Sequence, residues 1–583
     1  MLLWQILDKN ILKGNTPMRT FFNTIKSLMQ YAPQKKYHFN LQNKECTSNF
    51  ESSDTTDSQN VFPNLEKNLD FLKYKYNALI CTDIIIREFS LFAKNIKYNA
   101  FVIYIDGMSD SNAINNFILQ PLMLRNRANT FDKKTKKLVN YKTIEKVKLK
   151  KIKTEKKVPL QNTILESLLP QNSIKQLNTF SGILSAINMG DCVLFVDSLD
   201  LAFDIDVKGF KQRSIESPSN EIVIRGSQEA FVENIRTNTS ILRRLINNEN
   251  LVLESVTVGK ITKTQVAVGY LKDTANDDLV SEVLYRITSL DIDYLISSGQ
   301  LEQLIQDSPN SVYPQLIATE RPDKVANFLL EGRVVILVNG SPYALVAPGT
   351  FTDFLTSPED WNLKFQFANL QKIVRFLATI LSMLLPGIYI SITTYHQELI
   401  PTELLFTITA AREAVPFPTF VDILLMEISF ELIREAGLRV PSPLGVTIGI
   451  VGTLILGDAA VSASLVSPIL IIVVAITAIC SYSIPDYSLS FTFRLYRFVY
   501  MILGVVAGFL GLGFGIFIQL LLMCNLKSFG IPYLTPFALM KNKRSISSYF
   551  VLPMWKRERT SDFLHAKRKV SQRKTSMTWR KVN

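Results

Sequence analysis

The sequence predicts an α/β N-terminal half of two subdomains, on the cytoplasmic side, followed by a polytopic α-helical membrane domain. Three observations carry this prediction: strand-like and helix-like segments alternate up to about residue 375, long uncharged runs follow, and a basic segment comes last. The expected ranges are a polar, largely disordered arm at 1–72, subdomains at 73–246 and 247–370, a membrane domain at 371–537 and a basic cytoplasmic tail at 538–583.

The first subdomain is expected to contain buried strands and one long insertion. The segments NAFVIYIDGMSD and DCVLFVDSLDLAFDIDV have the apolar alternation of half-buried strands. Between them, residues 132–157 contain twelve lysines in 26 residues. This insertion is either a solvated loop or a contact with lipid headgroups or a partner.

A helix is predicted after Ser227, which is a favourable N-cap residue. Its apolar positions share one side of a 3.6-residue period: Phe231, Ile235, Leu242 and Leu245. Arg236 and Arg243 fall on the other side. These arginines are candidates for subunit interface or coupling contacts, and the alternative is a solvated or intramolecularly salt-bridged face.

The second subdomain repeats the mixture of strands and helices. Strands are predicted at 251–259 and 264–271, and helices at 279–290 and 299–307. The Asn339-Gly340 pair lies between two apolar alternations and predicts a β-hairpin.

Four uncharged runs predict the membrane domain: 376–394, 443–457, 469–485 and 498–525. A spanning helix needs about 20 apolar residues, so the middle two are slightly short and the last is long enough to bend near 511–515. Close helix packing is expected at Gly445, Gly449 and Gly452, which are candidate interface or coupling positions. Structural breaks are expected at Pro386, Pro468 and Pro485.

Acidic residues interrupt the apolar segments in two places. Glu427, Glu431 and Glu435 advance by about 40° per step around a helix and so form one stripe, which lies either at the membrane interface or along a hydrated path. Asp458 lies in the small-residue bend between two short spans. The candidate ion pathway therefore consists of Glu427, Glu431 and Asp458.

The basic tail predicts the orientation. Residues 541–583 contain 13 Lys and Arg against two acids, which accounts for +11 of the net charge of +13. Lys and Arg collect on the cytoplasmic side, so both ends are expected there, with an even number of crossings. We expect four, with the acid-striped helix not crossing and the Asp458 bend on the cytoplasmic side. DNA binding by the tail is a weaker alternative than anionic lipid.

Several other classes of protein are disfavoured. The five cysteines and three histidines are dispersed and suggest no metal site, haem motif or disulfide framework, so no cofactor is expected. The first residues lack the features of a cleaved signal peptide. No phosphate-binding loop, GxSxG or HExxH motif is present, which indicates that the protein is not an enzyme, and no nucleic-acid partner is expected.

Several stretches together resemble the A-subunit family of spore germination receptors, the GerA type: FVENIRTNTSILRR, QLIATERPDKVANFLLEGRVVILVNGSPYALVAPGTF, REAVPFPTFVDILLMEISFELIREAGLRVPSPLG and SFGIPYLTPF. The resemblance runs from about residue 72 to 537. It departs from the family at Asp458, where a glutamine is expected.

The resemblance implies a multi-pass protein of the spore inner membrane that acts with a transporter-like B subunit and a lipoprotein C subunit. It further implies that a small germinant binds the B subunit, and that the A subunit forms a homo-oligomer, a pentamer, and passes the signal on as ion flux. The alternatives are a SpoVAF-like stand-alone accessory channel of the same family, or a scaffold subunit.

Overall fold

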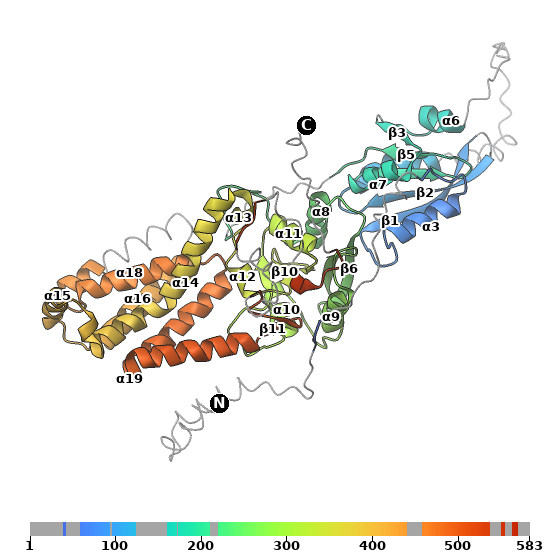
Figure 1. The fold of residues 1–583 in the computed structure, drawn as a ribbon. Coiled ribbons are helices and arrows are strands. Elements are labelled where there is room, and N and C mark those ends of the chain that lie inside the picture. The colour runs from blue at the N-terminus through green and yellow to red at the C-terminus, as the bar shows by residue number, and fades with distance from the viewer. Residues whose placement is uncertain are drawn as a thin grey trace, which may run out of the picture.

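The computed structural model describes residues 39–41, 59–93, 96–123, 160–171, 173–209, 218, 220–439, 457–536, 550–553 and 562–568. It is elongated, with two α/β units in a row and a helical half at one end (Figure 1). The lysine-rich insertion 132–157, Gly445, Gly449 and Gly452 lie outside these ranges, as do most of the arm and tail.

The two α/β units share one topology. Each has a five-stranded antiparallel sheet, in the order β1-β2-β4-β5-β3 and β6-β7-β9-β10-β8, so strands of equivalent rank occupy equivalent places. The first unit contains α3 (Leu65–Lys75), β1 (Ile84–Ala93), β2 (Ile96–Ile105), α4 (Ser111–Ala113), η1 (Ile114–Leu119), α6 (Leu160–Ser167), β3 (Ile174–Leu177), α7 (Phe180–Asn188), β4 (Cys192–Val196) and β5 (Ala202–Ile205).

The second unit contains the matching elements: α8 (Ile235–Leu245), β6 (Leu251–Val258), β7 (Thr264–Leu271), α9 (Asp277–Thr288), α10 (Ser298–Ile305), β8 (Ile317–Thr319), α11 (Pro322–Glu331), β9 (Val334–Val338) and β10 (Ala344–Ala347). The predicted strands at 251–259 and 264–271 and the hairpin at Asn339-Gly340 are all present. Gly340 has a φ of +89°, which explains why glycine follows Asn339 in this turn.

The helix that opens each unit begins in the same way. Asn64 caps α3 and Asn234 caps α8, each accepting hydrogen bonds from backbone amides of the first turn. Four residues later, the Asn68 and Asn238 side chains each bridge the backbone N–H and C=O of the residue six positions before them. The predicted start at Ser227 is therefore wrong, because Asn234 supplies a better-placed cap.

The helical half contains α12 (Phe351–Phe354), α13 (Glu359–Asn362), α14 (Phe365–Thr394), η2 (Gln397–Leu399), α15 (Thr402–Glu413), α16 (Thr419–Arg439), α18 (Pro468–Tyr482) and α19 (Tyr487–Asn525), followed by β11 (Lys527–Ser528), β12 (Ile531–Pro532) and η6 (Asp562–Leu564). We call its end beside the α/β units proximal and its opposite end, at α15, distal (Figure 1).

The longest helix, α19, is a hairpin of two helical segments. Ala507 and Gly508 have non-helical backbone angles, and Gly508 has a φ of +55°. After this break the chain reverses, since Tyr500 hydrogen-bonds to Gln519 and a Cβ on Gly515 would lie 2.6 Å from Leu503. Both ends of α19 are therefore proximal. The bend expected near 511–515 lies at 507–508, where glycine can adopt the left-handed conformation that the reversal needs.

The three expected prolines behave differently. Pro468 occupies the first turn of α18, where its missing N–H costs nothing, and Pro485 lies between α18 and α19. Pro386, in contrast, does not break α14, which is continuous from Phe365 to Thr394. Neighbouring helices compensate for its missing hydrogen bond, as described below.

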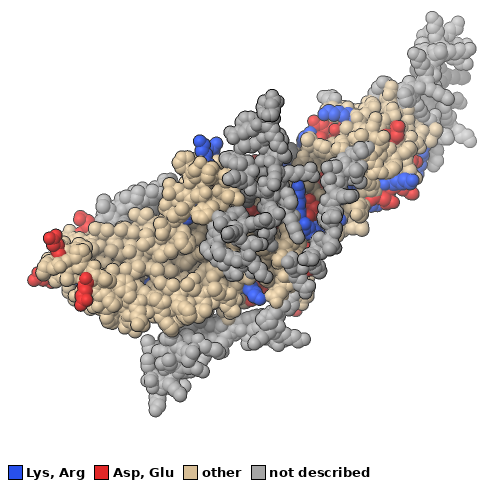
Figure 2. Space-filling view, in the orientation of Figure 1, with Lys and Arg blue, Asp and Glu red and all other residues tan. Residues whose placement is uncertain are grey.

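Two helices, α14 and α19, are long and apolar enough to cross a membrane, by length and composition, and α18 is a shorter apolar helix. In α19 the break divides this length into two segments. Large apolar side chains are exposed along all three helices, among them Phe376, Ile472, Ile479, Leu510 and Phe517. Figure 2 shows the helical half almost without charge on the visible face, except at its distal tip. Large exposed apolar surfaces of this kind mark contacts with a membrane or with other proteins.

A buried ion pair joins the two α/β units. Arg243 of α8 donates to Asp83, just before β1, from Nε at 2.7 Å and from NH2 at 3.0 Å, and both side chains are buried. Burial disfavours the charged form, but Asp83 outweighs it and raises the pKa of Arg243 above its usual value. Because the remaining side of α8 packs in the core of the second unit, this pair connects the units.

Replacing Arg243 by alanine would leave Asp83 buried without its partner and cost about 3–5 kcal/mol. Arg236→Ala is the matched control, because Arg236 is exposed and its 3.6 Å pair with Asp106 is worth about 1 kcal/mol or less. Thermal unfolding of the full-length chain in detergent should show a large drop in Tm for Arg243→Ala and a small one for Arg236→Ala. Equal shifts would contradict this assignment.

Candidate functional site

Arg497 of α19 is the centre of a buried charge network in the helical half. Its Nε donates to the backbone carbonyl of Ser382 in α14 at 3.0 Å. That carbonyl is available because Pro386, four residues later, has no N–H to donate to it. Its NH1 donates to the carboxylate of Glu427 in α16, and both side chains are 0% exposed. Arg497 therefore ties three helices together.

A second pair lies one helical turn away. Arg494 donates from NH1 to Glu431 at 2.7 Å, and Arg434 approaches the same carboxylate at 3.7 Å. Arg434 also stacks on Tyr482, 4.3 Å from the ring centroid, and donates to Ser481 at 2.6 Å. The acids are four residues apart on α16 and the arginines three apart on α19. Either spacing places two side chains on the same face of a helix, so these two faces lie against each other.

Two of the predicted ion-pathway residues, Glu427 and Glu431, are the acids of these pairs. Glu427 is completely buried and Glu431 is 26% exposed, and each is bound to an arginine of the same chain. One oxygen of each carboxylate, Oε1, makes no hydrogen bond. The acid-striped helix was expected not to cross with the others. In the structure it packs beside α14 and α18, and its acids bind arginines of α19.

Asp458 lies apart from this network, at the distal end. Val466 and Leu470, at the start of α18, pack against Ile390 near the end of α14 and Ile423 in the first turn of α16. Asp458 itself is exposed. The bend was expected on the same side as the α/β half, but it lies at the opposite end, because α18 runs from distal to proximal.

The second α/β unit and the helical half share one hydrophobic core. It includes residues of β7, β9 and α11 together with Met383, Phe493, Leu512, Met523 and Tyr533. Tyr313, in the loop before β8, lies at its centre: it stacks on Tyr496, and its hydroxyl accepts from Gln519 at 2.7 Å. Thr492 donates to the neighbouring Val312 carbonyl at 2.7 Å. We call this contact the Tyr313 joint.

The hairpin after α19 also inserts into the second unit. Ser528 donates to the Gln315 carbonyl at 2.5 Å and accepts from the Gly349 amide at 3.1 Å. Phe529 donates its amide to Asp307 at 2.5 Å, and its ring lies under the Arg286 guanidinium. The two ends of the α19 hairpin are thus both fixed to the second unit.

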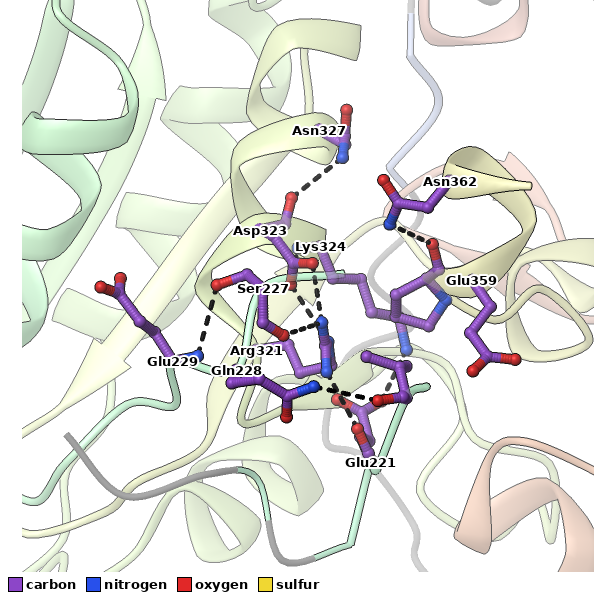
Figure 3. Close-up of polar contacts among 12 residues, drawn as sticks. Glu221, Ser227, Gln228, Glu229, Arg321, Asp323, Lys324, Asn327, Glu359 and Asn362 are labelled. Carbon is purple, nitrogen blue, oxygen red and sulfur yellow. Dashed lines mark hydrogen bonds and ion pairs between the residues drawn. The ribbon is translucent and has the colours of Figure 1, made fainter. Parts of the chain in front are cut away.

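Arg321 holds the segment that leads from the first unit into α8, residues 220–229 (Figure 3). It is completely buried and donates to the carbonyls of Glu221 at 3.1 Å and Ser227 at 2.8 Å, while Asp323 neutralises it at 2.8 Å. Lys324 pairs with the Glu221 carboxylate at 2.8 Å. The segment ERPDK, which carries the resemblance described above, therefore positions the connection between the units.

Arg494 and Arg497 were not among the predicted site residues. The signal was present, since two arginines three residues apart stand in an otherwise apolar segment, FTFRLYRFVY, and buried arginines imply buried acids nearby. No group of three His, Cys, Asp or Glu within the described ranges is placed to hold a metal ion.

Glu302, on α10 next to the start of α19, makes the proximal end sensitive to pH. Burial, and to a lesser extent Asp486, raise its pKa to about 7. Since this lies above the value of about 4.3 expected when unfolded, the folded state holds its proton more tightly. Stability should therefore fall as pH rises from about 4.5 to about 7, by about 1–3 kcal/mol, and then level off.

Glu302→Gln removes this titration, so Tm measured from pH 5 to pH 8 should decline less steeply than in the wild type. Glu398→Gln, which changes an exposed acid at the distal end, should leave the slope unaltered. A wild-type slope in Glu302→Gln would assign the effect to another group.

The chain was compared with known proteins. A family model described as Bacillus/Clostridium GerA spore germination protein matches residues 70–563. Spore germination protein KA of Bacillus subtilis (strain 168) is 36% identical over 514 residues, which cover 88% of this chain and 89% of that protein. Uncharacterized membrane protein YfkQ of the same organism is 35% identical over 495 residues, or 85% and 90% of the two chains.

Spore germination protein B1 of Bacillus subtilis (strain 168) is 41% identical over 360 residues, 62% of this chain and 74% of that protein. Among solved structures, the N-terminal domain of the A subunit of the Bacillus megaterium spore germinant receptor GerK3 is 30% identical, with a TM-score of 0.36, over 50% of this chain and 98% of that chain. The resemblance found in the sequence is confirmed: this chain belongs to the GerA family of Bacillus and Clostridium spore germination proteins.

Proposed function

We propose that this chain is the A subunit of a spore germinant receptor, a multi-pass protein of the spore inner membrane that oligomerises and converts nutrient sensing into ion release. Family membership supports the receptor role. The observation that carries the membrane role is the helical half, where the buried Arg494 and Arg497 are paired with acids while the outer side chains are apolar. Charged residues at membrane depth are costly unless they are paired in this way.

The proposed partners follow from the family. They are a transporter-like B subunit, which binds the germinant, a lipoprotein C subunit, membrane lipids, and further copies of this chain in a pentamer. Arg236, Arg243, Gly445, Gly449 and Gly452 remain the proposed interface or coupling positions. Of these, Arg243 acts inside the chain, between the two α/β units, which favours coupling over a subunit interface for this residue.

We place the α/β units and the tail in the cytoplasm, facing the spore core. One contact supports their common side: Lys567 of the tail pairs with Asp277 of α9 at 2.6 Å, and Leu564 is buried beside it. The distal end, with α15 and Asp458, is then on the outer face of the membrane.

In the proposed mechanism, movement of the α/β units reaches the helices through the Tyr313 joint. The contacts of Arg497 with Glu427 and of Arg494 with Glu431 hold α16 against α19, and ions pass when these helices separate. Glu427, Glu431 and Asp458 are the acids proposed to attract cations along the path.

Spores lacking this chain should fail to respond to one set of nutrients and respond normally to others. In spores that carry Glu431→Gln or Asp458→Asn, potassium release after germinant addition should be several-fold slower at normal protein levels. Glu398→Gln, an exposed acid outside the proposed path, should release potassium at the wild-type rate.

Wild-type rates in both path variants would remove these acids from the conduction model. Equal slowing of germination by every nutrient in the deletion strain would favour the SpoVAF-like accessory role instead. The scaffold alternative predicts that Glu431→Gln changes protein levels and ion release together.

The orientation can be tested with single cysteines. Cys524 is exposed at the proximal end, so a membrane-impermeant maleimide should not label it from outside in intact cells that express the protein. A cysteine at the exposed distal position Glu398, in a Cys524→Ser background, should be labelled. Labelling of Cys524 alone would reverse the proposed orientation.

A further inference from the structure

Three helices bring polar residues together at the distal end. Ile390 of α14, Ile423 of α16 and Val466, just before α18, belong to one hydrophobic cluster. Each has a polar neighbour in sequence, namely Tyr389, Asp422 and Ser467. Tyr389 packs against this cluster, and its hydroxyl lies beside the Ser467 side chain and within the electrostatic influence of the Asp422 carboxylate.

These polar atoms are buried and are not fully hydrogen-bonded. Asp422 is 0% exposed and Ser467 is 1% exposed. By distance and angle, neither carboxylate oxygen of Asp422 has a hydrogen-bond partner in the described part of the protein, and the Tyr389 and Ser467 hydroxyls, which lie near each other, have no other partner there. The nearest opposite charge, Arg412 of α15, attracts Asp422 electrostatically without contacting it. Leaving a buried carboxylate and two hydroxyls unbonded is costly, which points to a ligand that supplies the missing interactions.

The chemistry of the group favours a monovalent metal cation. Carboxylate and hydroxyl oxygens are hard ligands, which suit alkali and alkaline-earth cations. One buried carboxylate balances one positive charge, which favours a monovalent over a divalent cation.

The surroundings would supply such a cation. Among the described residues 394–422 and 457–468 there are five acids and one arginine, Arg412. Four of the acids are exposed, at Glu398, Glu403, Glu413 and Asp458. Figure 2 shows acidic side chains gathered at this tip of the molecule. A surface of one sign raises the local concentration of counter-ions.

We propose that the distal end of the helical half binds one alkali cation, Na⁺ or K⁺, through the Asp422 carboxylate and the hydroxyls of Tyr389 and Ser467. This site is distinct from the Glu427 and Glu431 pairs, which are occupied by arginines. It does not depend on the proposed function, because binding to the resting protein can be measured without germination.

The test uses the full-length chain in detergent, with any subunits that purify with it. Tm is measured in NaCl, KCl and choline chloride at constant ionic strength. A ligand of the folded state raises Tm saturably, so Na⁺ or K⁺ should raise it, and choline, whose charge is shielded by methyl groups, should not. Asp422→Asn should abolish the rise. Tyr389→Phe and Ser467→Ala should each weaken the apparent affinity about tenfold.

Glu403→Gln is the matched control, because it removes an exposed acid from the same tip and should retain the saturable rise. Equal Tm values in the three salts, or a rise that persists in Asp422→Asn, would overturn the proposal. A wild-type Tm that depends on pH but not on the cation would also overturn it, by assigning a proton to Asp422. If Asp422→Asn does not fold, unchanged affinity in Tyr389→Phe and Ser467→Ala decides against the site.

Discussion

The helical half depends on the burial of one guanidinium group. Arg497 has no exposed surface, so all of its stabilisation must come from neighbouring atoms. Pro386 provides part of it by leaving the Ser382 carbonyl without its usual helical donor, and Glu427 provides the opposite charge. A proline that would ordinarily weaken a helix therefore becomes the reason that a second helix can place an arginine against it. The close approach of Gly387 to Gly504 allows the same two helices to come near enough.

Both ends of α19 contact the second α/β unit, so the helices packed around Arg497 are connected to that unit. Because Gly508 lets the chain reverse, both ends return to the second unit, one beside Val312 and the other at Tyr313. The distal break is held in turn by Tyr395, whose hydroxyl donates to the Val505 carbonyl at 2.6 Å. A displacement of the second unit thus reaches both segments of the hairpin at once, and through Arg497 it reaches α14 and α16.

Local sequence signals predicted local structure well. Alternation located the strands, Asn339-Gly340 located a hairpin, and Pro468 marked the start of a helix. Features that depend on distant partners were not predicted. The reversal at Gly508 requires Tyr395 and His396 to cover it, and the position of the acid stripe depends on arginines more than sixty residues away. No periodicity within one helix contains this information.

The boundary between the two α/β units, at the start of α8, was not predicted correctly for a different reason. The start of α8 could have been found by comparing the chain with itself, since an asparagine cap followed four residues later by a second asparagine occurs at Asn64 and again at Asn234. That comparison would have assigned α8 to the second unit. Of the two interpretations of its arginines, a subunit contact or an intramolecular salt bridge, the second describes Arg243, which pairs with Asp83.

The repeated topology has an evolutionary consequence. If the two units descend from one duplicated ancestor, the copies have since accepted different constraints. The second unit shares a hydrophobic core with the helical half, and its connection between α9 and α10 is short. Within the described ranges, the core of the first unit includes no residue of the helical half. Its equivalent connection, between η1 and α6, contains the lysine-rich insertion 132–157. On that view, the unit that packs against the helices keeps a short connection, and the unit without that contact can accept an insertion.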